Sequence, residues 1–166
     1  MIVRALTLAG GLAGAAGLSQ FPEFSQQYTQ RLAGKVEELT RFVAEFDADA
    51  QAVGISREAA LVDLDQSGAI GARRSQTMAA TIARQERLST ALDNLRGADP
   101  FSRAIHANAF TDGEVARGTL DDFKPAMPLT FEGIVFAVAG FLAGSFIFGV
   151  ILRILGMLFG RRRKAY

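Results

Sequence analysis

The sequence predicts an all-α membrane protein in which two transmembrane helices bracket an antiparallel, coiled-coil-like helical hairpin. Three observations predict this fold class: an unbroken apolar stretch near the C-terminus, positive charge gathered beside the apolar segments, and apolar residues between them at helical spacing. We expect five segments, namely an N-terminal transmembrane segment at 1–21, the hairpin at 22–98, short amphipathic helices at 99–128, a C-terminal transmembrane helix at 129–159 and a basic cytoplasmic tail at 160–166.

The C-terminal apolar stretch is the clearest feature of the chain. Residues 133–152 read GIVFAVAGFLAGSFIFGVIL, about 20 apolar or small residues that would extend roughly 30 Å as a helix, the thickness of the hydrocarbon core. Glu132 borders the stretch on one side, and Arg153 borders it on the other, where its long stem can snorkel. A soluble domain of this size does not need a helix that is apolar on every face, so we predict that this stretch spans a membrane.

The N-terminal apolar segment, residues 5–18, is shorter and permits three interpretations. It could be a short transmembrane helix, a cleaved signal peptide, or a re-entrant or interfacial segment. A repeat favours the transmembrane helix, because Ala9–Gly14 (AGGLAG) recurs as Ala139–Gly144 (AGFLAG), although glycine-rich composition alone could produce it. Each copy contains the Gly-x-x-x-Gly spacing that lets helices approach closely in lipid. The glycines expected at a helix–helix contact are Gly10, Gly14, Gly140 and Gly144.

The distribution of charge predicts the topology. Between residues 20 and 130 the chain carries 12 Lys and Arg against 16 Asp and Glu, a net charge of −4. The compensating positive charge lies beside the apolar segments, at Arg4, Arg153, Arg161, Arg162, Arg163 and Lys164. The positive-inside rule then predicts a multi-pass protein of a bacterial inner membrane, with both termini cytoplasmic and the hairpin periplasmic. These cations could also contact lipid headgroups. The sequence does not predict the broad basic surface that is typical of a nucleic-acid-binding protein.

Apolar spacing predicts the hairpin. We expect long helices at about 22–53 and 69–97, joined at the tip by a short helix at 57–65. If the long helices pair antiparallel with partner numbers summing to about 124, their apolar residues meet in one seam. The seam pairs are Leu32 with Leu92, Val36 with Leu88, Phe42 with Ile82, and Phe46 with Met78.

The same register brings opposite charges together. It predicts ion pairs of Asp47 and Asp49 with Arg73 and Arg74, of Glu37 and Glu38 with Arg84 and Arg87, and of Arg31 with Asp93. Exposed pairs contribute only tenths of a kcal/mol each, so we expect packing to supply the stability and charge to set the register.

No residue pattern points to catalysis, a cofactor or a metal site. Cysteine is absent, which excludes disulfides and thiol chemistry, and His106 is the single histidine. Residues 63–68 (DLDQSG) resemble the start of a calcium-binding loop. Arg74 nevertheless stands where that loop requires a bidentate glutamate, so we interpret the segment as a polar turn. We therefore predict a protein that is not an enzyme.

Two segments resemble a known family. Residues 4–28 (RALTLAGGLAGAAGLSQFPEFSQQY) and residues 121–130 (DDFKPAMPLT) are similar to the corresponding parts of a bacterial family of small inner-membrane proteins, known only as a domain of unknown function. The resemblance covers essentially the whole chain. It implies a protein with two spans, weighs against a cleaved signal peptide, and supplies no activity or catalytic residue.

The sequence does not identify an activity, so function remains a hypothesis. We expect a structural or accessory membrane protein that self-associates as a homo-oligomer or docks on a larger membrane complex, with membrane lipids as its other contacts. One alternative is a sensor with a periplasmic domain, which would need a partner to relay its signal because only a short basic tail follows the second span. Another alternative is a subunit of an oligomeric pore.

Overall fold

The computed structural model describes residues 1–160, apart from the side chains of residues 107, 108 and 158–160. Over the described residues the chain is helical and contains no strand. In chain order the elements are α1 (Ile2–Leu18), α2 (Phe21–Ala52), α3 (Arg57–Gln66), α4 (Ala69–Arg96), α5 (Pro100–Ile105), the short 3₁₀ helix η1 (Ala107–Phe110), α6 (Gly113–Asp121) and α7 (Phe131–Gly160). They form two compact units, Met1–Gln26 with Phe123–Tyr166, and Gln27–Asp122.

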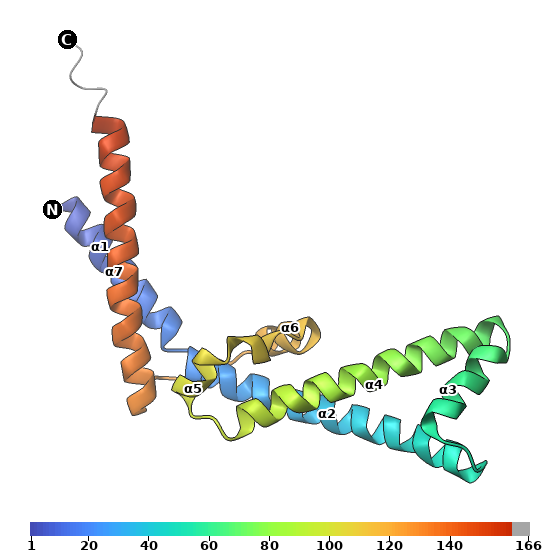
Figure 1. Cartoon of the computed structure of the whole chain (residues 1–166). Helices are drawn as coiled ribbons and strands as arrows, with labels where there is room; N and C mark the ends of the chain where they lie inside the picture. The colour runs from blue at the N-terminus through green and yellow to red at the C-terminus, as the bar shows by residue number, and fades with distance from the viewer. Residues whose placement is uncertain (161–166) are drawn as a thin grey trace. The chain divides into compact units, whose positions relative to one another are not determined.

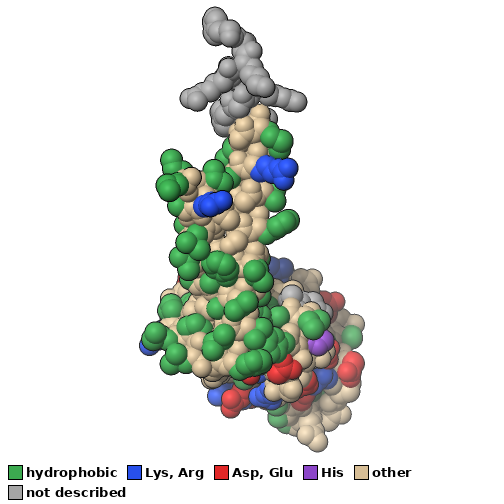
Figure 2. All heavy atoms as spheres, turned by 90° about the vertical axis from the view of Figure 1, so that its left-hand side faces the viewer, with side chains coloured by type: hydrophobic (Ala, Val, Ile, Leu, Met, Phe, Trp, Pro, Cys, Tyr) green, Lys and Arg blue, Asp and Glu red, His purple; other side chains and the backbone are tan. Residues whose placement is uncertain are grey.

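The first unit is built on α1 and α7, which pack side by side and antiparallel (Figure 1). The described residues contain two candidate membrane spans by length and composition, one of them Phe131–Met157, whose mean hydropathy is 2.5 over an 18-residue stretch. The other begins at Ile2, has a mean hydropathy of 1.4 over a stretch of the same length, and belongs to a helical segment that continues into α2. Figure 2 shows hydrophobic side chains gathered over the surface of this helix pair, with Lys and Arg side chains near its upper end. Two helices that could cross a membrane are what the sequence predicts.

The second unit contains most of α2, together with α3 and α4, in the region for which the hairpin was predicted, and α3 joins α2 to α4. Gly54 and Gly68 sit at the two turns with φ of 79° and 100°, a conformation that favours glycine. Ser56 caps α3, because its hydroxyl accepts a hydrogen bond from Ala59 N–H at 3.2 Å. The expected helices at about 22–53, 57–65 and 69–97 correspond to α2, α3 and α4.

The predicted seam is buried in only half of its length. Leu32, Val36, Leu88 and Leu92 lie in the core, together with Tyr28 and Leu95, which complete the packing at this end. Toward α3 the two long helices diverge (Figure 1), and their backbones approach closely at few points at most. Phe42 is 42% exposed, and Ile82 is half-buried. The structure therefore does not confirm a coiled coil that is continuous along both helices.

The predicted charge register is wrong, although one polar contact fits the helix pairing. Gln85 Nε2 donates to Thr40 Oγ1 at 3.0 Å, a pair whose numbers sum close to 124. The ion pairs join other elements instead: Arg57 with Asp47, Arg84 with Asp112 and Glu114, and Arg31 with Asp122. Acidic residues of α6 and its flanks, which the hairpin prediction left out, pair with Arg84 and Arg31, two of the arginines that it had paired with the opposite long helix.

Candidate functional sites: a glycine-packed helix pair and an apolar pocket

The four predicted contact glycines meet in the α1–α7 pair. A Cβ built on Gly14 would overlap the carbonyl oxygen of Gly140 and lie 3.1 Å from Gly144 Cα. A Cβ on Gly144 would overlap the carbonyl oxygen of Gly10 and lie 3.2 Å from Gly14 Cα. Backbone therefore touches backbone, which is the close approach that small residues allow between helices in lipid. These glycines are used within one chain, so they are not free to join two chains.

Neighbouring side chains complete this contact. A Cβ on Gly11 would lie 2.7 Å from the ring of Phe141, and a Cβ on Gly140 would lie 2.9 Å from Leu18 Cβ. By contrast, a Cβ on Gly17, Gly149 or Gly156 would meet nothing within 4 Å. The contact is therefore confined to one face of each helix.

The register of this pair relates Arg4 to Arg153. Gly10 opposes Gly144 and Gly14 opposes Gly140, so opposed residue numbers sum to about 154. By this rule both arginines fall near the same end of the pair. The other cations predicted to fix topology and contact lipid headgroups, Arg161, Arg162, Arg163 and Lys164, lie outside the described residues.

Gln20 links the start of the chain to the segment before α7. Its side-chain Nε2 donates to the Ala126 carbonyl at 3.1 Å, and its Oε1 accepts from Ala126 N–H at 3.1 Å. Two aromatic contacts lie alongside, Phe21 with Phe136 at a centroid distance of 5.2 Å and Phe24 with Phe123 at 6.1 Å. The two segments quoted above for their family resemblance, 4–28 and 121–130, thus contact each other.

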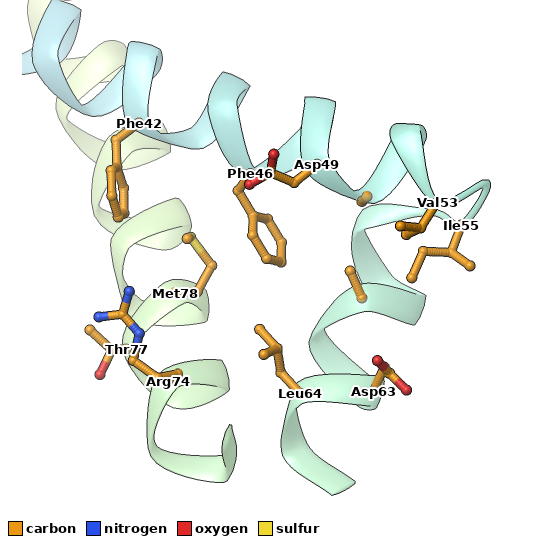
Figure 3. Close-up of a pocket in the computed structure, with 12 residues that line it drawn as sticks. Phe42, Phe46, Asp49, Val53, Ile55, Asp63, Leu64, Arg74, Thr77 and Met78 are labelled. Carbon is orange, nitrogen blue, oxygen red and sulfur yellow. The ribbon is translucent and has the colours of Figure 1, made fainter. Parts of the chain in front are cut away.

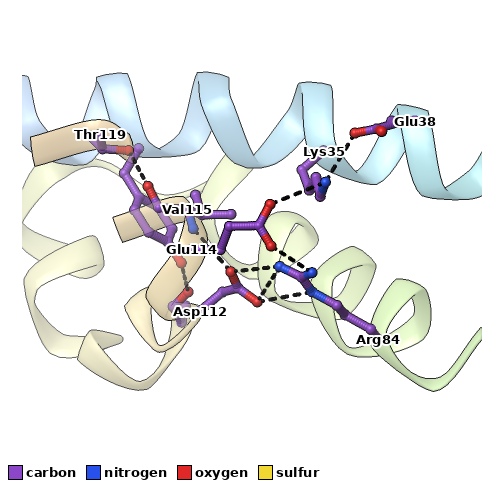
Figure 4. Close-up of polar contacts among 9 residues, drawn as sticks. Lys35, Glu38, Arg84, Asp112, Glu114, Val115 and Thr119 are labelled. Atoms are coloured by element: carbon purple, nitrogen blue, oxygen red, sulfur yellow. Dashed lines mark hydrogen bonds and ion pairs between the residues drawn. The ribbon is translucent and has the colours of Figure 1, made fainter. Parts of the chain in front are cut away.

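A polar cluster ties α6 to both long helices of the hairpin (Figure 4). Arg84 lies between two carboxylates, 3.0 Å from Asp112 Oδ1 and 2.8 Å from Glu114 Oε2. Lys35 Nζ lies 3.3 Å from Glu114 Oε1 and 3.2 Å from Glu38 Oε2. Asp112 also caps α6, since its Oδ1 accepts from Val115 N–H at 3.0 Å. The cluster is a structural clamp made of ion pairs and a helix cap.

The clamp changes the acidity of its carboxyl groups. Burial alone would raise the pKa of Asp112, but the hydrogen bond from Val115 N–H and the charge of Arg84 outweigh it and lower that pKa. Arg84 and then Lys35 lower the pKa of Glu114. Both carboxyl groups are therefore held in the charged form at neutral pH.

An apolar pocket of about 420 Å³ opens where α2 and α4 diverge. Figure 3 shows Phe42 and Phe46 of α2, Leu64 of α3 and Met78 of α4 pointing toward one another across it. Val53 and Ile55 line its end, at the turn between α2 and α3. The charged residues of the lining are Asp49, Asp63 and Arg74. Phe42, Phe46 and Met78, from the distal half of the predicted seam, therefore line an open pocket.

The residues that the sequence analysis considered for a metal site lie apart from one another. His106 is exposed at the end of α5. Asp63, from the loop that resembles a calcium site, lies at the pocket, and the described residues hold no group of three or more His, Asp or Glu that could bind a metal.

The comparisons with known proteins give a family without an established function. A family model described as "Protein of unknown function (DUF2937)" matches residues 2–161. No curated protein matches the chain, and neither does any solved structure.

Proposed function

The chain belongs to the family of unknown function DUF2937, and from this premise we propose that it is a non-enzymatic integral membrane protein that serves a larger membrane assembly as a structural or accessory component. In this proposal α1 and α7 anchor the chain in a bacterial inner membrane, and the unit Gln27–Asp122 docks on a partner. The observation that carries the proposal is the open, apolar pocket of the hairpin, in a chain whose packing glycines are already used within its own helix pair.

The helix pair supports anchoring. A cleaved signal peptide has no need to pack backbone against backbone on a helix more than 100 residues away, whereas α1 does so at Gly10 and Gly14. Arg4 and Arg153 near one end of the pair fit a topology with both termini cytoplasmic. The helix–helix contact therefore favours the two-span interpretation over a signal peptide.

The pocket supports docking. Large apolar side chains left in contact with water are costly, and exposed apolar patches on stable proteins mark sites of interaction. Val53 is exposed at the end of the pocket, and Val62 of α3 and Ile70 of α4 are further exposed apolar residues of the elements that form it. An amphipathic helix of a partner, or of a second copy, would bury its apolar face here in the manner of helix-in-groove recognition.

Native mass measurement of the whole chain, extracted in mild detergent, tests this proposal. We expect a discrete complex, either homo-oligomeric or with a defined partner. The double variant Phe42→Glu/Val53→Glu should convert the complex to monomer, because both side chains are exposed at the pocket.

The control is Leu120→Glu, which places one negative charge, against two in the double variant, on an exposed apolar residue of α6 away from the pocket lining. It should leave the complex intact. A monomeric wild-type chain, or a complex that the double variant leaves unchanged, would refute docking through the pocket. A closed homo-oligomer that encloses a channel would instead favour the pore alternative.

A sensor is the second candidate, because a pocket of about 420 Å³ with apolar walls and three charged residues is in the size range of small-molecule sites. Thermal unfolding of the whole chain in detergent, with a panel of amino acids, sugars and aromatic acids, tests it. A compound that raises the unfolding midpoint of the wild type, but not of Met78→Asp, would place this candidate ahead.

A further inference from the structure

The segment between Phe123 and α7 carries an apolar surface that packing within its own unit does not cover. Met127 is 79% exposed, Leu129 is 81% exposed and Phe131 is 73% exposed. The three side chains alternate along the sequence, and Phe131 begins α7. Ile134 and Val138 of α7 are exposed as well, so the apolar surface runs on into the membrane-spanning candidate.

Part of the backbone of this non-helical segment is hydrogen-bonded. The Gln20 side chain pairs with both the N–H and the carbonyl of Ala126, and Leu129 N–H donates to the Met127 carbonyl at 2.8 Å. Pro125 and Pro128 have no N–H to satisfy. Non-helical backbone is costly next to hydrocarbon because its polar groups lack partners there, and these hydrogen bonds reduce that cost.

The segment is also fixed against the start of α7. A Cβ on Gly133 would lie 2.9 Å from Pro128 Cβ, so Pro128 packs closely on the first turn of the helix. Thr130 Oγ1 accepts from Gly133 N–H at 3.1 Å and caps that turn. The apolar side chains therefore project from a held backbone.

We propose that Met127, Leu129 and Phe131 insert into the lipid headgroup–acyl boundary and form an interfacial anchor beside the span. The partner is the lipid surface itself. Covalent continuity with α7 places the segment within a few residues of the membrane border, where apolar side chains can enter lipid. The inference rests on the proposed membrane anchoring and adds a second, non-helical point of attachment to it.

Single tryptophan variants test the proposal cleanly, because the chain contains no tryptophan. Met127→Trp and Leu129→Trp are reconstituted separately, as whole chains, in phosphatidylcholine vesicles brominated either near the headgroup or near the chain ends. Leu142→Trp, at an exposed position of α7, reports the bilayer interior, and Ile70→Trp, at an exposed position of the charged hairpin, reports water.

We expect blue-shifted emission from both segment variants, with strong loss of intensity from bromine near the headgroup and little from bromine near the chain ends. Leu142→Trp should show the opposite order, and Ile70→Trp should be unquenched. Segment tryptophans that no brominated lipid quenches, while Leu142→Trp is quenched, would overturn the interfacial anchor and leave membrane anchoring intact. Blue-shifted but unquenched emission would mean that protein covers the segment, which also overturns it. If Leu142→Trp is not quenched either, anchoring itself fails.

Discussion

At the residue scale, Gly14 and Gly140 set how closely α1 can approach α7, because each faces backbone of the other helix. Gly14→Leu should lower the stability of the helix pair by about 1–3 kcal/mol, the usual cost of overpacking a close contact. The measurement is the thermal unfolding midpoint of the whole chain in detergent. Gly17→Leu is the matched control on the same helix, since nothing lies within 4 Å of that position, and an equal loss in both variants would contradict the assigned contact.

Gln20 offers a second test at this scale. Gln20→Ala removes both hydrogen bonds to Ala126, which should cost about 1 kcal/mol for each bond. The control is Gln26→Ala, an exposed glutamine a short distance along α2. Proteolysis of the segment before α7 should accelerate in the first variant alone; unchanged cleavage would show that Gln20 does not hold Ala126 in place.

The sequence anticipated the contact glycines but not the role of Gln20. Glycine spacing on a helix is local information, so Gly10, Gly14, Gly140 and Gly144 could be selected from the residue pattern alone. The Gln20–Ala126 pair joins residues 106 positions apart, and a single glutamine between Ser19 and Phe21 carries no sign of such a partner. The family resemblance of the two segments was the available signal.

At the scale of elements, Asp112 joins α6 to α4 and also caps α6. Asp112→Asn should keep the cap, because asparagine caps helices well, and lose the ion pair with Arg84. Asp112→Ala should lose both, and should be less stable than Asp112→Asn by about 1 kcal/mol in denaturant unfolding. Equal stabilities for the two variants would show that the cap contributes nothing.

The pH dependence follows from the same cluster. Because the folded state lowers the pKa of Asp112 and of Glu114, their contribution is fully present above the unfolded values of about 4 and is lost as pH falls through the lower folded values. Wild-type stability should therefore decline in acid below about pH 4. The decline should be shallower for Asp112→Asn, as measured by unfolding midpoints across the acid range; an identical slope would show that Asp112 does not contribute.

A tight corner between α3 and α4 gives a further prediction. A Cβ on Gly71 would overlap Ser67 Oγ and the Leu64 carbonyl oxygen, and Ser75 Oγ donates to the Leu61 carbonyl at 2.8 Å. Gly71→Ala should therefore destabilise the chain. Gly34→Ala, in open space within α2, should stabilise it by about 0.5–1 kcal/mol through helix propensity. Denaturant midpoints that move in the same direction would contradict this assignment.

Helices were predictable at this scale, and their packing was not. Helix caps and helix breaks depend on the residues at the position itself, as at Ser56, Gly54 and Gly68. The positions of α2, α3 and α4 could therefore be predicted from the sequence. Which arginine meets which carboxylate depends on all elements that come within reach. Asp112 and Glu114 pair with Arg84 from outside the two long helices, and a prediction based on those two helices alone did not include them.

At the scale of the whole molecule, the proposed anchor and the proposed docking unit are separate compact units. The anchor uses its glycines internally, and the hairpin keeps an apolar pocket open. Apolar length predicted the C-terminal span, and the glycine repeat favoured the shorter N-terminal one. The pocket could not be foreseen, because the seam positions that line it follow the same periodicity as those that are buried. Periodicity gives the face of a helix and not the distance to its partner.

Cysteine accessibility tests the two-span topology, the central claim, most directly, because the chain has no cysteine of its own. Ile70→Cys places a thiol at an exposed position of the hairpin, and Ile2→Cys places one at the start of α1. In intact cells a membrane-impermeant maleimide should label Ile70→Cys, and should label Ile2→Cys only after lysis. Labelling of Ile2→Cys in intact cells, or its loss from the mature chain by cleavage, would contradict the two-span topology.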